Sequence, residues 1–123
     1  MNRRYPNPRF RLRIVFSEDE MIGPGKAELL ERISNTGSIA AAGREMGMSY
    51  KRAWQLVETM NAMFNEPVVL STRGGASGGG ATLTETGKAV LSGYRSLEDE
   101  AQKAAEEHIA RLQGMLRIRG DEN

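Results

Sequence analysis

The chain contains no cysteine and no long hydrophobic run. Without cysteine there can be no disulfide framework, thiolate zinc site, iron–sulfur cluster or cysteine nucleophile, and a reducing compartment is favoured. No stretch approaches the roughly 20 apolar residues of a membrane span, and the N-terminal residues lack the apolar core of a signal peptide. We therefore expect a cytoplasmic protein that makes no contact with a membrane.

The sequence also has little net charge. Its 17 Lys and Arg residues nearly balance 16 Asp and Glu residues, which leaves a net charge of +1 in 123 residues. The charges are nevertheless segregated, because five arginines and no acid lie in residues 1–16 and acids concentrate in residues 98–107. A locally basic surface for a polyanion is therefore compatible with this chain. The length predicts one domain over residues 1–123 with a single core.

The first third of the chain has the pattern of a strand followed by a helix. Residues 9–16 alternate basic and apolar side chains, which places Phe10, Leu12 and Ile14 on one face and predicts a strand. A Gly-Pro-Gly sequence then favours the start of a helix, and an Asn-Thr-Gly sequence favours its end. A helix is therefore expected over residues 24–35.

Two further helices are each introduced by a serine that can cap them. Ser38 precedes a run of small residues, which let another helix approach closely, and Ser49 precedes a helix that extends to about residue 64. This third helix carries apolar residues at the spacing of a packed face. We expect Trp54 to lie on that face, in the core.

A glycine-rich hairpin and a long helix complete the pattern. Short apolar segments flank a tip with five glycines in residues 68–83, which predicts a two-stranded hairpin. Residues 84–117 contain few helix breakers and predict a helix roughly 50 Å long, longer than a domain of this size is wide. Part of this helix should therefore find no surface within its own chain.

Apolar and small residues recur along the long helix in alternating steps of four and three. This spacing predicts a helix–helix dimer interface. The alternative is a helix packed wholly on its own domain, because alanine and histidine occupy positions where a strong coiled coil has leucine. The predicted interface residues of the helix are Val90, Tyr94, Leu97, Ala101, Ala104, His108 and Leu112.

The order of these elements predicts a fold. Three helices with a tight turn before the third, followed by a glycine-tipped hairpin, indicate a winged helix-turn-helix of the mainly α (α+β) class over residues 9–83. The recognition helix is expected at about residues 49–64 and the wing at about residues 68–83. The helix over residues 84–117 would serve dimerisation.

This fold predicts how DNA would be contacted. A helix fits the major groove, and its N-terminal residues meet the base edges. Arg52 can donate two hydrogen bonds to guanine, Gln55 can pair with adenine and Lys51 suits a phosphate, although a basic pair can also simply solubilise a surface helix. A glycine-rich tip can press its backbone N–H groups against phosphates. The predicted DNA-binding residues are Ser38, Arg44, Ser49, Tyr50, Lys51, Arg52, Gln55, Arg73, Gly74, Gly75 and Ser77.

Other chemistry finds little support in the sequence. His108 has Glu106 and Glu107 beside it rather than at helical ligand spacing, so no metal site is expected. Neither Gly-Lys-Ala sequence has the glycine spacing or the Ser or Thr of a nucleotide-binding loop. The acids at residues 98–100 have no partner base or nucleophile and fit a solvated helix face. We therefore predict no enzyme activity, no metal and no cofactor.

Several sequence strings resemble a known family. Thr-Gly-Ser-Ile at residues 36–39 is one of them, and the most specific are Ser-Tyr-Lys-Arg-Ala-Trp at residues 49–54 and the glycine-rich wing at residues 74–81. Over residues 10–94 the chain resembles the N-terminal DNA-binding domain of ModE-type molybdate-responsive transcriptional regulators. LysR-type regulators share a related winged helix.

The resemblance implies a bacterial or archaeal repressor or activator that dimerises through its N-terminal strand, with Phe10 and Leu12, and its long helices. It also implies that residues 49–55 enter the major groove. In full-length ModE-type proteins a C-terminal β-rich module binds molybdate or tungstate, and this chain ends shortly after its long helix. We therefore expect no oxyanion site within this chain, so that a response to molybdate would need a second protein or another site.

Two hypotheses follow for the function. The first is a homodimeric transcriptional regulator, associated with the nucleoid, that binds a pseudo-palindromic operator in double-stranded DNA. The second is a protein-interaction module that keeps the winged helix as a scaffold and recruits a partner regulator through its long helix. The near-neutral charge and the missing sensor module keep this second hypothesis open.

Overall fold

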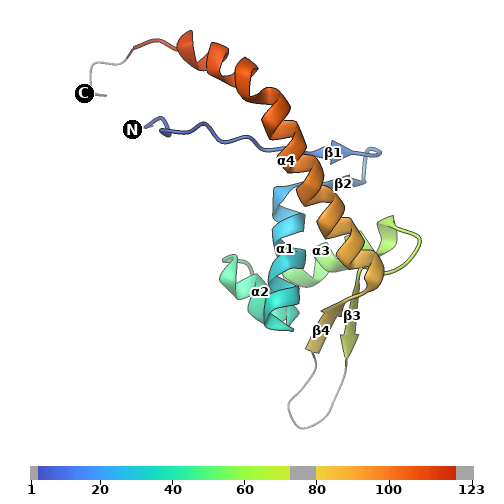
Figure 1. Cartoon of the computed structure of the whole chain (residues 1–123). Coiled ribbons are helices and arrows are strands. Elements are labelled where there is room, and N and C mark those ends of the chain that lie inside the picture. The colour runs from blue at the N-terminus through green and yellow to red at the C-terminus, as the bar shows by residue number, and fades with distance from the viewer. Residues whose placement is uncertain (1–2, 73–79, 119–123) are drawn as a thin grey trace.

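Short strands frame three packed helices, and a long helix follows them. The computed structural model describes residues 3–72 and 80–118 (Figure 1). The strands form two antiparallel pairs, each made of two consecutive strands. The elements are β1 (Ile14–Val15), β2 (Met21–Ile22), α1 (Pro24–Thr36), α2 (Ile39–Glu45), α3 (Tyr50–Met63), β3 (Val69–Thr72), β4 (Gly80–Leu83) and α4 (Glu85–Gly114). This order confirms the predicted mainly α winged helix-turn-helix.

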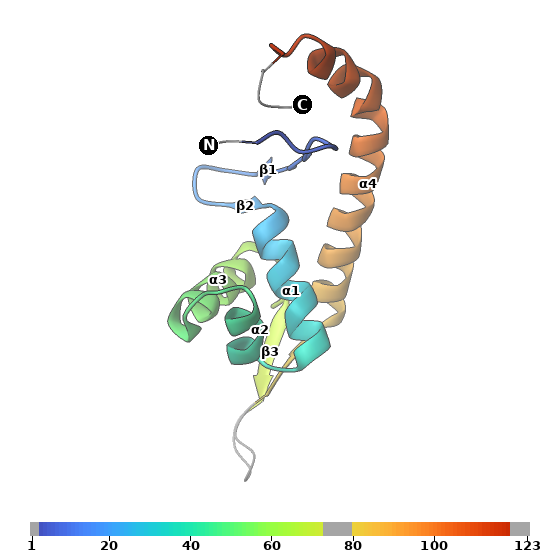
Figure 2. The ribbon, with the colours of Figure 1, turned by 90° about the vertical axis from the view of Figure 1, so that its left-hand side faces the viewer.

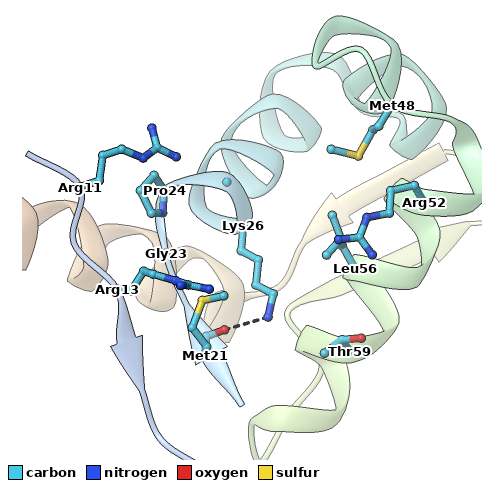
Figure 3. A pocket seen from close by; sticks show the side chains of 11 residues that line it. Arg11, Arg13, Met21, Gly23, Pro24, Lys26, Met48, Arg52, Leu56 and Thr59 are labelled. Atoms are coloured by element: carbon cyan, nitrogen blue, oxygen red, sulfur yellow. Dashed lines mark hydrogen bonds between the residues drawn. The ribbon is translucent and has the colours of Figure 1, made fainter. Parts of the chain in front are cut away.

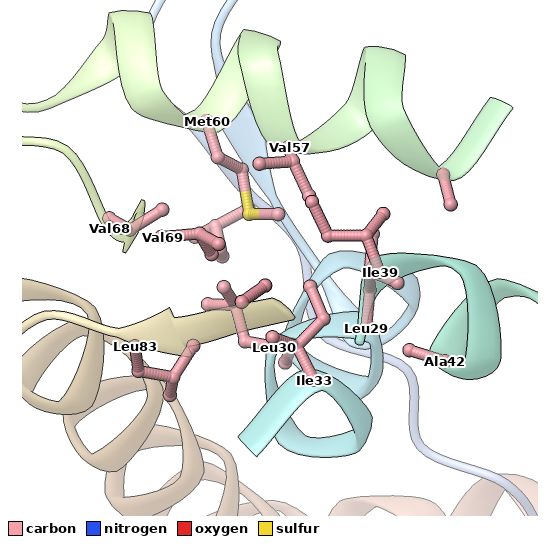
Figure 4. Close-up of a cluster of buried hydrophobic side chains, with 14 of the residues drawn as sticks. Leu29, Leu30, Ile33, Ile39, Ala42, Val57, Met60, Val68, Val69 and Leu83 are labelled. Atoms are coloured by element: carbon pink, nitrogen blue, oxygen red, sulfur yellow. The ribbon is translucent and has the colours of Figure 1, made fainter. Parts of the chain in front are cut away.

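The first helix is the centre of the fold. Figure 2 shows α1 between α4 on one side and the α2–α3 pair on the other. Its apolar residues, spaced three and four apart, face both neighbours and are buried. The core in Figure 4 therefore joins all the helices through α1. The largest fully buried side chains are Leu29, Leu30, Ile33, Met60 and Val68.

A left-handed glycine connects the end of α1 to the wing. Gly37 has a φ of 72°, which glycine adopts without strain, and its N–H donates to the Ile33 carbonyl at 2.8 Å. Its own carbonyl accepts a hydrogen bond from the Ala81 N–H of β4 at 2.9 Å. The predicted stop signal therefore ends α1 at Thr36, one residue later than expected, and also holds β4 in place.

The two middle helices approach each other closely. Ser38 accepts a hydrogen bond from the Ala41 N–H, and Ser49 accepts one from the Arg52 N–H, as expected of capping residues. A Cβ on Gly43 of α2 would lie 2.9 Å from the Cβ of Ala53 in α3. Small residues thus set the spacing of the helix-turn-helix, which confirms the prediction from the sequence.

Asn61 links α3 to the wing. Its side-chain oxygen accepts hydrogen bonds from the N–H groups of Val68 and Val69, at 2.8 Å and 3.1 Å, and its amide donates to the Val69 carbonyl at 3.1 Å. These three bonds satisfy backbone groups that the chain reversal after α3 would otherwise leave without partners. The orientation of β3 is therefore fixed relative to α3.

The long helix α4 is anchored at its beginning and exposed at its end. Thr84 caps it by accepting a hydrogen bond from the Gly87 N–H at 2.9 Å. Further along, Arg95 bridges Glu31 of α1 and Glu98 of α4 at 2.9 Å and 3.0 Å. The helix ends at Gly114, shortly before the predicted residue 117, and at 1.5 Å per residue it is about 45 Å long. Figure 2 shows its far end continuing beyond the other helices.

The N-terminal strand is shorter than the sequence predicts. Only Ile14 and Val15 pair with a neighbour, β2, which the sequence did not indicate. Phe10 and Leu12 are half-buried between exposed arginines, so the predicted alternation is present, but these residues pair with no strand of the described structure. A strand needs a partner for its backbone groups, and a two-residue β2 supplies one for two residues only.

Candidate nucleic-acid interface

The N-terminal part of α3 presents polar and aromatic side chains to solvent. Ala53, Val57 and Met60 bury one face of the helix in the core, which fixes the rotation of the other face. All five residues of that outer face are exposed, with Tyr50 at 57% and Trp54 at 42%. We call this surface the reading face, and it consists of Tyr50, Lys51, Arg52, Trp54 and Gln55.

Trp54 corrects an expectation from the sequence. The sequence predicts it in the core, yet it is one of the exposed large apolar residues of the described chain. Ala53, its neighbour, occupies the position that contacts α2, where a Cβ on Gly43 would already be crowded. A bulky indole cannot replace it there, so the helix turns Trp54 outward, beside Tyr50 one helical turn earlier. The sequence reasoning missed this residue as part of the interface.

The other predicted residues of the helix-turn-helix lie around the reading face. The hydroxyl groups of Ser38 and Ser49 are engaged as helix caps. Arg44 is exposed in the last turn of α2. Within residues 3–72 and 80–118, Arg44, Lys51 and Arg52 form no ion pair with a carboxylate, so their charges are available to an external anion.

The wing is described only near its base. Thr72 pairs with Gly80, and its hydroxyl accepts a hydrogen bond from the Gly80 N–H at 3.0 Å. Leu70, Ser71 and Thr72 are exposed along β3. The predicted contacts at Arg73, Gly74, Gly75 and Ser77 lie outside the described residues.

A second basic surface adjoins the reading face, and the sequence reasoning did not identify it. A cleft of about 670 Å³ lies between the N-terminal segment, the start of α1 and one side of α3 (Figure 3). We call it the cationic cleft, because Arg11, Arg13, Lys26 and Arg52 line it and no carboxylate does. The alternating arginines of residues 9–13 were the only sequence signal for it.

Lys26 shows the electrostatic character of the cleft. It is half-buried, and its ammonium donates to the Met21 carbonyl at 2.8 Å, as the dashed line in Figure 3 marks. Burial, followed by the charges of Arg52 and Arg13, lowers the pKa of Lys26 below its usual value. A lysine in this position is stabilised when an anion approaches.

The part of the chain that the structure describes contains no cluster of three or more side chains suited to a metal. No helix in the described ranges is long and apolar enough to cross a membrane.

The fold and the exposed face of α3 define a winged helix-turn-helix DNA-binding protein. The family comparison agrees, because residues 25–88 match the model of the bacterial regulatory helix-turn-helix protein, lysR family. The chain belongs to this family. Among the curated proteins that resemble it are several named as ModE transcriptional regulators.

Three curated relatives carry molybdenum-related or regulatory names. The chain is 45% identical to the molybdenum-pterin-binding protein MopA of Rhodobacter capsulatus over 83 residues, 68% of this chain and 31% of MopA. It is 41% identical to the molybdenum transport protein ModE of Azotobacter vinelandii over 71% of this chain and 32% of the relative. It is 37% identical to the DNA-binding transcriptional dual regulator ModE of Escherichia coli K12 over 66% of this chain and 31% of the relative. The matches thus span about a third of the relatives' length.

Proposed function

We propose that this chain binds a specific DNA sequence through the reading face of α3. The observation that carries the proposal is the two-sided character of this helix. One side is held in the core by Ala53, Val57 and Met60, while the side that would enter a major groove carries side chains able to contact bases and phosphates.

Each side chain of the reading face has a role in this proposal. Arg52 donates two hydrogen bonds to a guanine, Gln55 pairs with an adenine, and Lys51 contacts a phosphate. Tyr50 and Trp54 supply apolar contact to thymine methyl groups and sugars. Ser38, Ser49 and Arg44 position the two helices on the backbone, with the wing residues beyond β3 contacting an adjacent groove.

We further propose a homodimer that forms through the outer half of α4. Leu97 and Leu112 are 42% and 62% exposed, and Ala101, Ala104 and His108 lie between them on the same helix. We call the predicted interface residues of α4, from Val90 to Leu112, the seam. It needs one correction, because Tyr94 is 3% exposed and donates its hydroxyl to the Leu12 carbonyl at 2.6 Å within its own chain. Burial accordingly raises the pKa of Tyr94.

The residues at the beginning of α4 therefore pack mainly within their own chain. Val90 packs against the core, as the alternative of a self-packed helix expects, and Phe10 and Leu12 are half-buried. The outer part is more exposed, with Leu112 at 62%, Leu116 at 49% and Ile118 at 89% exposure. A two-fold dimer through this part would present two reading faces to a pseudo-palindromic operator in the cytoplasm, on the nucleoid. The names of the relatives make genes of molybdenum handling the first targets to examine.

Substitutions on the reading face test the DNA-binding proposal. Arg52→Ala should weaken binding to the specific site by about 1–3 kcal/mol and relax the sequence preference, because a bidentate base contact is lost. Lys51→Ala should weaken binding to all duplexes similarly and lower the salt slope by about 1, because a phosphate contact is lost. Titration of a fluorescently labelled duplex at several salt concentrations measures both effects.

Lys103→Ala is the matched control, since Lys103 is an exposed cation on α4 that pairs with Asp99 away from α3. Its affinity and salt slope should equal those of the wild type. Unchanged binding in both α3 variants would refute the role of the reading face. A stoichiometric protein partner, together with no affinity for DNA at low salt, would instead favour the protein-interaction module.

A further inference from the structure

The cationic cleft brings together basic residues with no carboxylate among its lining residues. Several other basic residues have carboxylate partners, as Arg32 has in Glu28 and Glu45, and Arg95 has in Glu31 and Glu98. The four basic residues of the cleft converge from three segments without a carboxylate among the lining residues. Their mutual repulsion is an energetic cost that a bound anion would remove.

The geometry of the cleft concentrates this charge. In Figure 3 the side chains of Arg13 and Arg52 approach Lys26 from opposite sides, the first from the N-terminal segment and the second from α3. Lys26 lies between them with its ammonium held by the Met21 carbonyl. Arginine and lysine together provide several N–H donors around one volume, which suits an oxygen-rich anion with more than one acceptor.

We propose that the cationic cleft is a binding site for a phosphate group. The group can belong to the DNA backbone beside the groove that α3 enters, or to a free phosphorylated compound. Binding of a DNA phosphate rests on the proposed function, whereas binding of a free phosphorylated compound does not. This site is separate from the β-rich oxyanion-binding module of full-length ModE-type proteins, and it departs from the prediction that the chain holds no oxyanion site.

The test removes charge from the cleft without touching α3 or the core. Arg11→Gln/Arg13→Gln removes two cations that are exposed and form no hydrogen bond or ion pair with described residues. Arg3→Gln/Arg9→Gln is the matched control, because it removes the same charge from the same segment outside the cleft. Both variants should give circular dichroism spectra and unfolding midpoints close to those of the wild type.

The first arm titrates the full chain with inorganic phosphate and follows the amide signals of Gly25 and Lys26 by NMR. Sodium chloride at equal ionic strength controls for screening. In the wild type we expect saturable shifts, and in the cleft variant an affinity lower by about tenfold or more, because charge-assisted hydrogen bonds are lost. The control variant should bind phosphate nearly as the wild type does.

The second arm measures the salt dependence of binding to a DNA duplex. If the phosphate belongs to DNA, the slope should fall by about 1 to 2 in the cleft variant and change less in the control variant. If the cleft variant loses phosphate binding but keeps the wild-type salt slope, the phosphate belongs to a free phosphorylated compound. If its salt slope falls without a loss of phosphate binding, the phosphate belongs to the DNA backbone. If the cleft variant and the control variant have the same phosphate affinity and the same salt slope, the proposed site is overturned.

The two arms separate this site from the proposed function. If the wild-type chain binds no DNA, the proposed function fails, and the phosphate titration alone decides the cleft. Saturable shifts that the cleft variant loses would then support it, and the absence of such shifts in the wild type would overturn it.

Discussion

Gly87→Ala should lower the free energy of unfolding by about 2–3 kcal/mol, although alanine is the better helix former. A Cβ on Gly87 would overlap the carbonyl oxygen of Val68 and lie 2.9 Å from the Val68 carbonyl carbon. That carbonyl also accepts a hydrogen bond from the Thr84 N–H, so it cannot move away without releasing the start of α4. Urea unfolding followed by circular dichroism measures the change.

Gly93→Ala is the control for this prediction. Gly93 lies in the same helix, and a Cβ there would have no atom within 4 Å. The substitution should therefore raise the free energy of unfolding by about 0.5–1 kcal/mol through helix propensity alone. Equal effects at the two glycines would show that α4 is not packed against the backbone of Val68 as described.

The double substitution Leu97→Glu/Leu112→Glu should convert the dimer to a monomer and weaken binding to the full operator by about 100-fold or more. Both leucines are exposed in the single chain and belong to the proposed seam of α4. Charged groups in a helix–helix interface lose their hydration, and a monomer loses the avidity of two linked half-sites. Sedimentation equilibrium gives the oligomeric state, and titration of the operator gives the affinity.

The matched variant Gln102→Glu/Ala110→Glu adds the same two negative charges to exposed positions outside the seam. It should remain dimeric and retain its affinity. A wild-type chain that is monomeric at micromolar concentration would refute the dimer. A Leu97→Glu/Leu112→Glu variant that sediments like the wild type would also refute the dimer.

Local signals in the sequence predicted most of the helices. Ser38 and Ser49 cap helices in the structure as expected, and Gly37 ends α1 in the left-handed conformation. Such signals succeed because a cap or a stop depends on residues a few positions apart. The helix-turn-helix could therefore be assembled from the sequence, and the family comparison agrees with it.

Contacts between distant segments were not predictable in this way. The three hydrogen bonds of Asn61 depend on how the chain reverses after α3, and the cationic cleft needs the N-terminal segment beside α3. The periodicity of α3 placed Trp54 wrongly, because its small neighbour Ala53 takes the buried position. In α4, spacing alone could not distinguish Tyr94, which packs in its own core, from Leu97, which is exposed.

The most direct test of the proposed function is selection of DNA fragments by the full chain from a genomic library, followed by sequencing of the bound fragments. Under the proposed function we expect enrichment of one motif with two-fold symmetry, whose half-sites are spaced by about one turn of the duplex or a multiple of it. We also expect Arg52→Ala to lose the preference at one position of each half-site. Bound fragments without any shared motif, at a salt concentration where binding persists, would contradict it.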